Sequence, residues 1–321
     1  MSLVKDPNHI KLGIAGMVEE NGHPYSWAAI LNGFEPQEMA QVGYPMIFNY
    51  LSAQPRGDYG IDGVSVTHAW CDDRQDAERL ACASRIPHVV DCPEDLLGQV
   101  DAVLIPTDKG AEHVERARPF IEANLPVYVD KPLADSAQDL KRFIKWHQSG
   151  KAILSTTMMR YCPEYAKCQA QAYEIGELRL IILTIAKSWE RYGVHALEGV
   201  YRFLEPGKWL SVANTGTGKA NMVHARHQSG VDVLIPAVDD MFGGFGCLHL
   251  YGTQGRLSAR FTDGSRFVSF KSQLTDFVQY LRTGQSPVPF SHIVEIIEMV
   301  IAGIRSREEN GRVVSLTEIL A

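Results

Sequence analysis

Hydrophobic positions in the first half of the chain alternate between short apolar runs and longer segments in which apolar residues recur every three or four positions. The short runs predict β-strands, and the longer segments predict amphipathic helices. Strands that alternate with helices form a parallel sheet covered on both faces, because each crossover carries a helix. We therefore expect a doubly wound α/β domain over residues 1–157. Its expected strands are 10–15, 64–70, 101–106, 127–129 and 152–156, and its expected helices are 76–85, 113–124 and one that begins at Ser136.

The pattern changes after Arg160 to β-like runs separated by turn signals such as Ser229-Gly230 and Asp263-Gly264. Runs spaced in this way, without long helices between them, predict a mostly antiparallel sheet. We therefore expect an α+β domain over residues 158–321. Its expected strands are 178–186, 220–227, 231–237, 246–251 and 256–261, and its expected helices are 195–204, 274–282 and the strongly amphipathic 291–308.

Residues 33–63 fit neither pattern. They are too many for a simple loop between the first helix and the second strand, and they contain proline, glycine and several aromatic residues. We expect a mixed insertion with one short helix near residues 44–52.

Composition narrows the range of partners. The chain has 321 residues with 31 basic and 38 acidic side chains, a formal charge of −7, and no basic run that would bind nucleic acid. The longest aliphatic stretch, 180–186, is far short of the ~20 residues that span a bilayer. The N-terminus is polar and the six cysteines lack metal-like spacing, so we expect a cytoplasmic protein with ordinary thiols and no metal site.

The turn after the first strand is a candidate phosphate loop. A dinucleotide site needs glycines here so that the backbone can approach the pyrophosphate. Gly16, followed by Met17, stands at the first glycine position, but Val18 and Asn21 occupy the two later ones, and two glutamates lie between them. The loop alone therefore leaves two interpretations open, a dinucleotide site and a tight turn that binds no nucleotide.

Two further candidates follow later strands. Asp72 comes after the second strand, where a carboxylate would bond the adenosine ribose and repel a 2′-phosphate, although Arg74 keeps NADP possible. Lys131 follows the strand expected at 127–129, at the sheet edge where open α/β sheets bind ligands. Beside an oxidised nicotinamide its pKa would fall, so that it could bond the reacting hydroxyl and ease proton loss. A surface lysine in a turn is the structural alternative.

Candidate substrate residues lie around the domain junction. Arg160 and Tyr161 follow the last strand of the first domain, and a guanidinium suits a polyol, carboxylate or phosphate. A helix of the second domain begins with a segment that contains Tyr192, His195 and Glu198. A histidine can take a proton from an alcohol as hydride leaves, because its unperturbed pKa lies near neutrality. A helix-capping or core histidine is the alternative.

These motifs, in this order, resemble the Gfo/Idh/MocA oxidoreductases, the family of glucose–fructose oxidoreductase and inositol dehydrogenase. Asp130 stands in place of the glutamate in the family's Glu-Lys-Pro signature, and Arg191 stands where the family commonly has aspartate. The segments that carry the resemblance are Gly13 to Gly16, Val100 to Thr107 with His113, Val129 to Ala134, Gly193 to Glu198, Tyr251 to Leu257, and the closing helices from Asp276.

The resemblance implies a Rossmann-like domain and an α+β domain whose outer sheet face often serves oligomerisation, hence a dimer or tetramer. It implies reversible hydride transfer between NAD or NADP, with NAD favoured, and a sugar, cyclitol or similar hydroxylated small molecule. It assigns catalysis to Lys131 and His195. It also places three residues near the nicotinamide half of the cofactor and one near the adenosine ribose: Thr107, His113 and Asp130, and Asp72.

Two alternatives stay open. The first is a relative that keeps NAD for transient redox chemistry during hydrolysis, epimerisation or elimination. The second is a non-catalytic protein that binds a small molecule or a partner. The altered glycine loop favours the second alternative, as does Arg191, because a positive charge there would lower the pKa of His195.

Overall fold

The computed structural model describes residues 1–321, and contacts along the chain divide them into two compact units. The first unit holds Met1–Leu133, Arg142–Ser155 and Phe270–Phe290, and the second holds Ala134–Lys141, Thr156–Ser269 and Ser291–Ala321. The division therefore differs from a single boundary after residue 157, because a late segment of the chain returns to the first unit.

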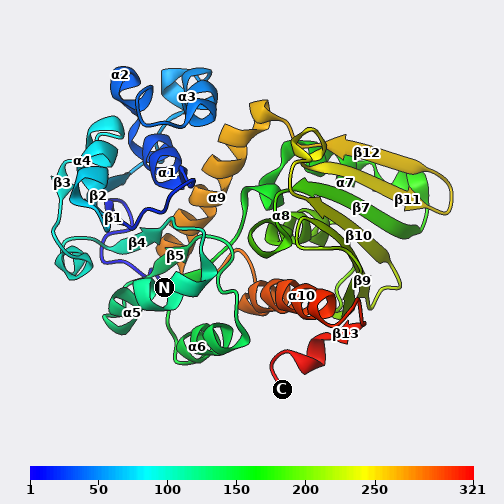
Figure 1. The fold of residues 1–321 in the computed structure, drawn as a ribbon. Helices are drawn as coiled ribbons and strands as arrows, with labels where there is room; N and C mark the ends of the chain where they lie inside the picture. The colour runs from blue at the N-terminus through cyan, green and yellow to red at the C-terminus, as the bar shows by residue number, and fades with distance from the viewer. The chain divides into compact units, whose positions relative to one another are not determined.

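The sheet of the first unit has six parallel strands in the order β3-β2-β1-β4-β5-β6 (Figure 1). The chain order reverses between β1 and β4, and the carboxyl ends at such a switch point form the ligand crevice of open α/β sheets. The predicted doubly wound sheet is confirmed, with the two-residue β3 as an addition. The strands are β1 (Ile10–Ala15), β2 (Val64–Trp70), β3 (His88–Val89), β4 (Ala102–Ile105), β5 (Val127–Val129) and β6 (Ile153–Leu154).

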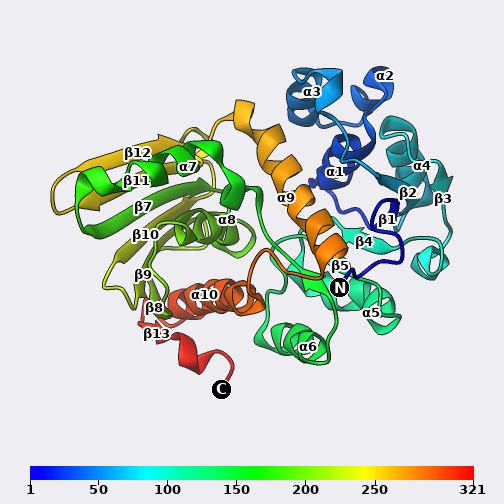
Figure 2. The same cartoon turned by 180° about the vertical axis from the view of Figure 1, so that it is seen from behind.

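Helices cover both faces of this sheet; α1 and α4 lie on one side and α5 on the other (Figures 1 and 2). The C-terminal part of α9, from Phe270 onward, joins the first unit. Its Phe277 packs on Tyr128 of β5, which also contacts Trp27, with 5.3 Å between ring centroids in each pair. The helices are α1 (His23–Asn32), α4 (Arg74–Ala83), α5 (Gly110–Glu122), α6 (Ala137–Gln148) and α9 (Asp263–Thr283).

The insertion at 33–63 forms two short helices, α2 (Pro36–Met39) and α3 (Pro45–Ser52), and the second confirms the helix expected there. Tyr44 and Ile47 cover the end of the β1–α1 loop. A Cβ atom on Gly22 would lie 2.3 Å from Ile47 Cδ1, so the absence of a side chain at Gly22 permits this packing. The insertion thus encloses the loop that precedes α1.

The second unit is built on a seven-stranded sheet in the order β12-β11-β7-β10-β9-β8-β13. Only the β7–β10 pair is parallel, so the predicted mostly antiparallel sheet is confirmed. Strands β8 and β13 were not expected from the sequence. The strands are β7 (Leu178–Ala186), β8 (Trp209–Asn214), β9 (Ala220–His227), β10 (Asp232–Val238), β11 (Cys247–Gly252), β12 (Arg256–Arg260) and β13 (Val314–Ser315).

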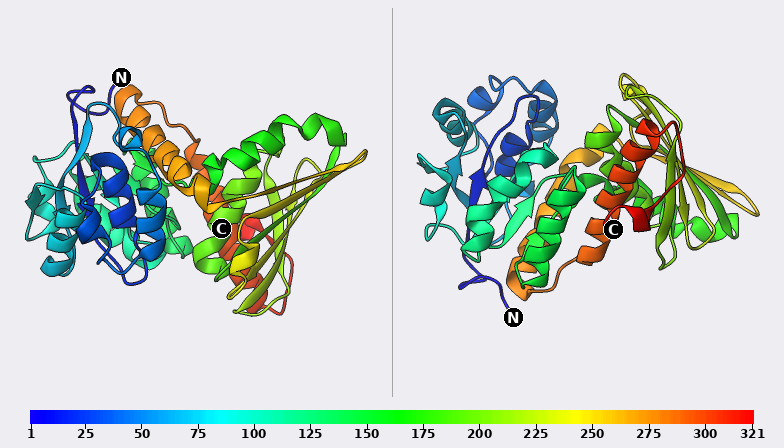
Figure 3. Two further views of the ribbon diagram at one scale, coloured as in Figure 1. Left: turned by 90° about the horizontal axis from the view of Figure 1, so that it is seen from above. Right: turned by 60° about the horizontal axis from the view of Figure 1, so that its bottom comes forward.

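Two helices, α8 (Trp189–Tyr201) and α10 (Phe290–Glu308), lie against one face of this sheet, and the opposite face carries no helix (Figure 3). The indole of Trp189 fixes their contact, because its Nε1 donates to the Val300 carbonyl at 2.9 Å. Helix α8 begins six residues before the expected start, and α7 (Pro163–Ala170) was not expected. None of the helices is both long enough and apolar enough to cross a bilayer.

Candidate active site

Lys131 lies at the carboxyl end of β5, directly after Asp130, and its peptide bond to Pro132 is cis. Its Nζ atom is 3.4 Å from Asp108 Oδ2, on the loop that follows β4, and each side chain is only 3% exposed. Because a charge removed from water needs a partner, this carboxylate stabilises the ammonium group. The pair places a lysine of fixed position at the ligand-binding edge of the sheet.

Asp130 connects the same edge to the start of α1. Its Oδ2 lies 2.5 Å from Nδ1 of His23, and its Oδ1 accepts the Lys131 backbone N–H at 2.8 Å. The carboxylate is buried, whereas His23 is 20% exposed and stacks on Trp27. Asp130 therefore holds two loops together through His23 and the Lys131 backbone.

Thr107 and His113 are fully buried beneath this edge. His113 Nδ1 lies 2.9 Å from the Pro132 carbonyl, and its Nε2 lies 3.1 Å from the Thr107 hydroxyl. Nε2 also lies 2.8 Å from the Thr107 carbonyl, so a neutral imidazole donates to one of the two carbonyls and its other nitrogen can accept only from the Thr107 hydroxyl. Burial lowers the pKa of His113, in keeping with the neutral form. The ring joins the loop after β4 to the loop after β5.

The β1–α1 loop is held by a side chain. Asn21 is buried; its Nδ2 donates to the Pro106 carbonyl at 2.8 Å and its Oδ1 accepts the His23 backbone N–H at 3.0 Å. Gly16 has φ 101°, a conformation that favours glycine, and Met17 beside it is half-buried. The loop is therefore ordered by an asparagine at a position where the dinucleotide fingerprint has glycine.

Asp72 lies after β2, and its side chain is 54% exposed. It pairs with Arg116 of α5, whose Nη2 is 2.8 Å from Asp72 Oδ2. The predicted ribose-binding carboxylate thus has a cationic partner from a helix that lies 44 residues later in the chain.

In the second unit, His195 lies one helical turn after Tyr192 on α8 and is 3% exposed. Its ring centroid is 5.1 Å from that of Tyr192 and 6.1 Å from that of Phe245. Lys187, directly after β7, donates from Nζ to the Tyr192 hydroxyl at 2.8 Å. The predicted residues Tyr192 and His195 therefore lie side by side, and Lys187 is an additional cation next to Tyr192.

Arg160 and Glu198 form a buried ion pair, with the guanidinium 22% and the carboxylate 3% exposed. Burial raises the pKa of Glu198, and Arg160 opposes that rise. Arg160 also lies over the ring of Tyr201, 5.8 Å from its centroid, and Tyr161 follows it in a short 3-10 helix, Met158–Tyr161. The two predicted substrate-binding charges are thus engaged with each other.

Comparison with known proteins finds a family model that matches part of the first unit. A family model described as an oxidoreductase family with an NAD-binding Rossmann fold, Gfo/Idh/MocA, matches residues 42–158. This segment of the chain is similar to the Gfo/Idh/MocA family. The predicted family resemblance and NAD-binding Rossmann fold are confirmed for this segment.

Individual relatives agree with this assignment. YceM of Salmonella typhimurium, named provisionally as an oxidoreductase, is 29% identical over 119 residues, which are 37% of this chain and 38% of that protein. The scyllo-inositol dehydrogenase of Lactobacillus casei superposes with a TM-score of 0.74 at 14% identity, covering 97% of this chain and 99% of that one. The myo-inositol dehydrogenase of the same organism, solved with NAD(H) and myo-inositol, superposes with a TM-score of 0.73 at 14% identity. The superposition covers 96% of each chain. At these identities the structural likeness shows the shared fold.

Residues at the switch point of the first unit fit a dinucleotide. A Cβ atom on Gly16 would lie 2.9 Å from Arg116 Nη1 and 3.0 Å from Thr107 Cγ2, so the missing side chain lets the Arg116 guanidinium approach the turn backbone, where a pyrophosphate would bind. Asp72 is accessible at the tip of β2, where a ribose carboxylate partner is expected. Asp108, Arg116 and His23 were not predicted, because each meets its partner only through the fold.

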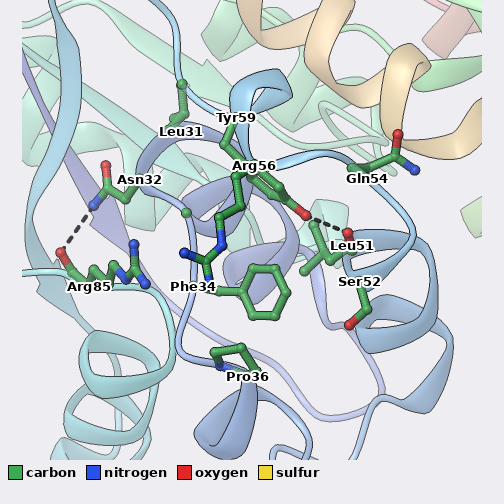
Figure 4. Close-up of a pocket in the computed structure, with 12 residues that line it drawn as sticks. Leu31, Asn32, Phe34, Pro36, Leu51, Ser52, Gln54, Arg56, Tyr59 and Arg85 are labelled. Carbon is green, nitrogen blue, oxygen red and sulfur yellow. Dashed lines mark hydrogen bonds between the residues drawn. The ribbon is translucent and has the colours of Figure 1, made fainter.

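A cavity of about 600 Å³ lies elsewhere in the first unit, between α1 and the insertion (Figure 4). Asn32 on its wall donates from Nδ2 to the Val66 carbonyl, near the amino end of β2, so the cavity is at the opposite end of that strand from Asp72. Its two arginines, Arg56 and Arg85, are exposed, and Arg85 pairs with Glu35 at 2.7 Å. No predicted site residue lines it.

Proposed function

We propose that the protein is an NAD(P)-dependent dehydrogenase or reductase that acts on a CH–OH group of a sugar, cyclitol or similar hydroxylated small molecule. The observation that carries the proposal is the buried Lys131, paired with Asp108 at the carboxyl end of β5 in an NAD-binding Rossmann domain. A buried lysine at this edge is positioned by its own domain, which favours a chemical role over a solvated turn.

The bound nicotinamide supplies the hydride acceptor or donor. Lys131 binds and orients the reacting hydroxyl, and His195 takes or returns its proton. Asp130 and His113 hold the loops that carry Lys131, through the contacts of Asp130 with His23 and of His113 with Pro132. Asp72 binds the adenosine ribose, and Gly16 and Met17 border the cofactor.

On the substrate side we assign Tyr192 to a hydroxyl, where Lys187 polarises the phenol through their 2.8 Å hydrogen bond. Arg160, Tyr161 and Glu198 bind further polar groups of the substrate. The structural relatives named as scyllo- and myo-inositol dehydrogenases support a polyol as the substrate class.

The test is a panel of inositols, aldoses and sugar acids with NAD or NADP, in which the absorbance of reduced nicotinamide is followed. Turnover of at least one polyol, with saturation, would support the proposal. Binding of the cofactor without turnover of any member would contradict it for this substrate class.

A non-catalytic binding protein is the second candidate, and the ion pair of Arg160 with Glu198 favours it, because these charges already satisfy each other. A protein of this kind would bind a polyol in calorimetry but produce no reduced nicotinamide. An NAD-assisted hydrolase or epimerase would instead retain NAD through purification, which mass spectrometry of the native protein would detect.

We also propose a cytoplasmic dimer or tetramer. The helix-free face of the second sheet carries Leu210 and Met222, which are 50% and 45% exposed, and their burial by a second copy would be favourable. Sedimentation velocity tests this assembly. A monomer at micromolar concentration would contradict it.

A further inference from the structure

Arg116 of α5 lies against the β1–α1 turn. Its Nη1 atom is 2.9 Å from the position that a Cβ atom on Gly16 would occupy, and its Cζ lies 5.9 Å from the centre of the Trp70 ring. Its side chain is only 14% exposed. The guanidinium is therefore held over the glycine backbone that a pyrophosphate approaches in a Rossmann fold.

Two carboxylates fix the orientation of this guanidinium. Asp72 contacts Nη1 and Nη2, at 3.2 and 2.8 Å, and Glu112 contacts Nε and Nη2, at 3.0 and 2.9 Å. Burial acts to lower the pKa of Arg116, but its hydrogen bonds to these carboxylates raise it overall. Nη1 carries a second N–H beyond the one that Asp72 accepts, and Nη1 is the atom nearest Gly16.

The loop below Arg116, residues 16–22, contains no lysine or arginine. Val18 and Asn21 replace two fingerprint glycines, Asn21 uses its side chain to hold the loop, and Glu19 and Glu20 are exposed and negative. A dinucleotide pyrophosphate is an anion, and arginine presents forked donors that match phosphate oxygens. The charge that the loop does not supply is available from α5.

We propose that Arg116 binds the pyrophosphate of the nicotinamide dinucleotide and replaces the attraction lost with the glycine loop. Asp72, which is exposed, turns from Arg116 to the ribose hydroxyls as the cofactor enters, and Glu112 keeps the guanidinium in place. This inference rests on the proposed function, because it requires the chain to bind the cofactor.

The test compares the wild-type protein with R116Q, R116K and the matched control R118Q. Arg118 lies on the same helix but is 41% exposed and pairs with Glu115. Calorimetric titrations with NAD, NADP, ADP-ribose and adenosine separate the pyrophosphate from the nucleoside. We expect R116Q to weaken NAD, NADP and ADP-ribose alike by about tenfold or more, and adenosine by less than about twofold. R116K should have dinucleotide affinities between those of R116Q and the wild type, because lysine keeps the charge but not the forked pair of donors. R118Q should bind as the wild type does.

Three results would overturn the inference and leave the proposed function standing. R116Q that binds NAD as tightly as the wild type would show that the guanidinium makes no contact, and tighter binding would show that it obstructs the site. A loss confined to NADP would assign Arg116 to the 2′-phosphate instead. In each of these cases the wild-type protein still binds cofactor and the proposed function stands. Failure of the wild type and all variants to bind any dinucleotide would refute both.

Discussion

The sheet edge of the first unit and the helical face of the second unit bury charge in different ways. At the sheet edge, Lys131 and Asp130 stand in loops directly after strands and meet their partners at 3.4 and 2.5 Å. On the helical face, Glu198 and Glu298 lie on helices, and burial raises the pKa of both carboxyls. Strand ends are fixed by sheet pairing, whereas the helical charges depend on how α8 and α10 pack. The positions of Lys131 and Asp130 at strand ends are therefore readable from the sequence, whereas the ion pairs in both regions depend on the fold.

The largest effect is expected from K131M. It leaves the buried Asp108 carboxylate without its cation, and we expect a loss of about 3–5 kcal/mol in the free energy of unfolding, measured by urea denaturation. Turnover should fall about 100-fold or more, because the hydroxyl loses its donor. The affinity for NAD should change little.

The double variant K131M/D108N separates these two effects. It replaces the Asp108 carboxylate by a neutral amide, so stability should recover while turnover stays low. Recovery of turnover in the double variant would remove Lys131 from the proposed chemistry.

On the helical face, E198Q is expected to have a smaller effect. It leaves the Arg160 guanidinium without its carboxylate, at a cost of about 2–3 kcal/mol in unfolding free energy, less than for Lys131 because Arg160 is 22% exposed. In a double-mutant cycle with R160M, the combined loss should be smaller than the sum of the single losses. Additive losses would mean that the ion pair contributes nothing to stability.

The β1–α1 loop should respond more weakly to N21A. This change removes the hydrogen bonds to the Pro106 carbonyl and the His23 backbone N–H, which predicts a loss of about 1–2 kcal/mol in unfolding free energy. The exposed Asn49 of α3 provides the control N49A, which should stay within about 0.5 kcal/mol of the wild type. Equal losses in the two variants would show that Asn21 does not order the loop.

The smallest effect is a pH dependence from Glu298. Burial, and then the charge of Glu295, raise the pKa of Glu298 to about 7, above the unfolded value of about 4.3. Between these values the folded protein binds the extra proton, so stability falls as pH rises from about 4.3 through about 7 and then levels off. Thermal unfolding of E298Q across this range should show a flatter profile, and an unchanged slope would exclude Glu298 as its source.

The sequence predicted most of the first unit because its strands are bounded by turns and separated by helices. Lys131 was found because it follows a strand, and the start of α8 was missed although Ser188 caps it, its Oγ accepting the Arg191 backbone N–H. Asp108, His23 and Arg116 carry no local signal. Asp130 and His23 are 107 residues apart, and only the ends of β5 and α1 bring them together.

The second unit was harder to predict for a related reason. Strand β8 follows a proline-glycine turn and has one exposed leucine, Leu210, which disturbs its alternation. Helix α9 continues into the first unit, where its Phe277 contacts Tyr128. No pattern along the chain predicts this contact. The local pattern predicted most strands of this sheet but not β8, β13 or α7, and the assignment of α9 to a unit required its packing.

The transfer of labelled hydrogen tests the central proposal most directly. A polyol carrying deuterium at its reacting carbon, incubated with the protein and NAD or NADP, should give reduced nicotinamide with one deuterium, as seen by mass spectrometry of the free cofactor. Deuterium that never leaves the polyol, while the protein demonstrably binds both the polyol and the dinucleotide, would contradict hydride transfer.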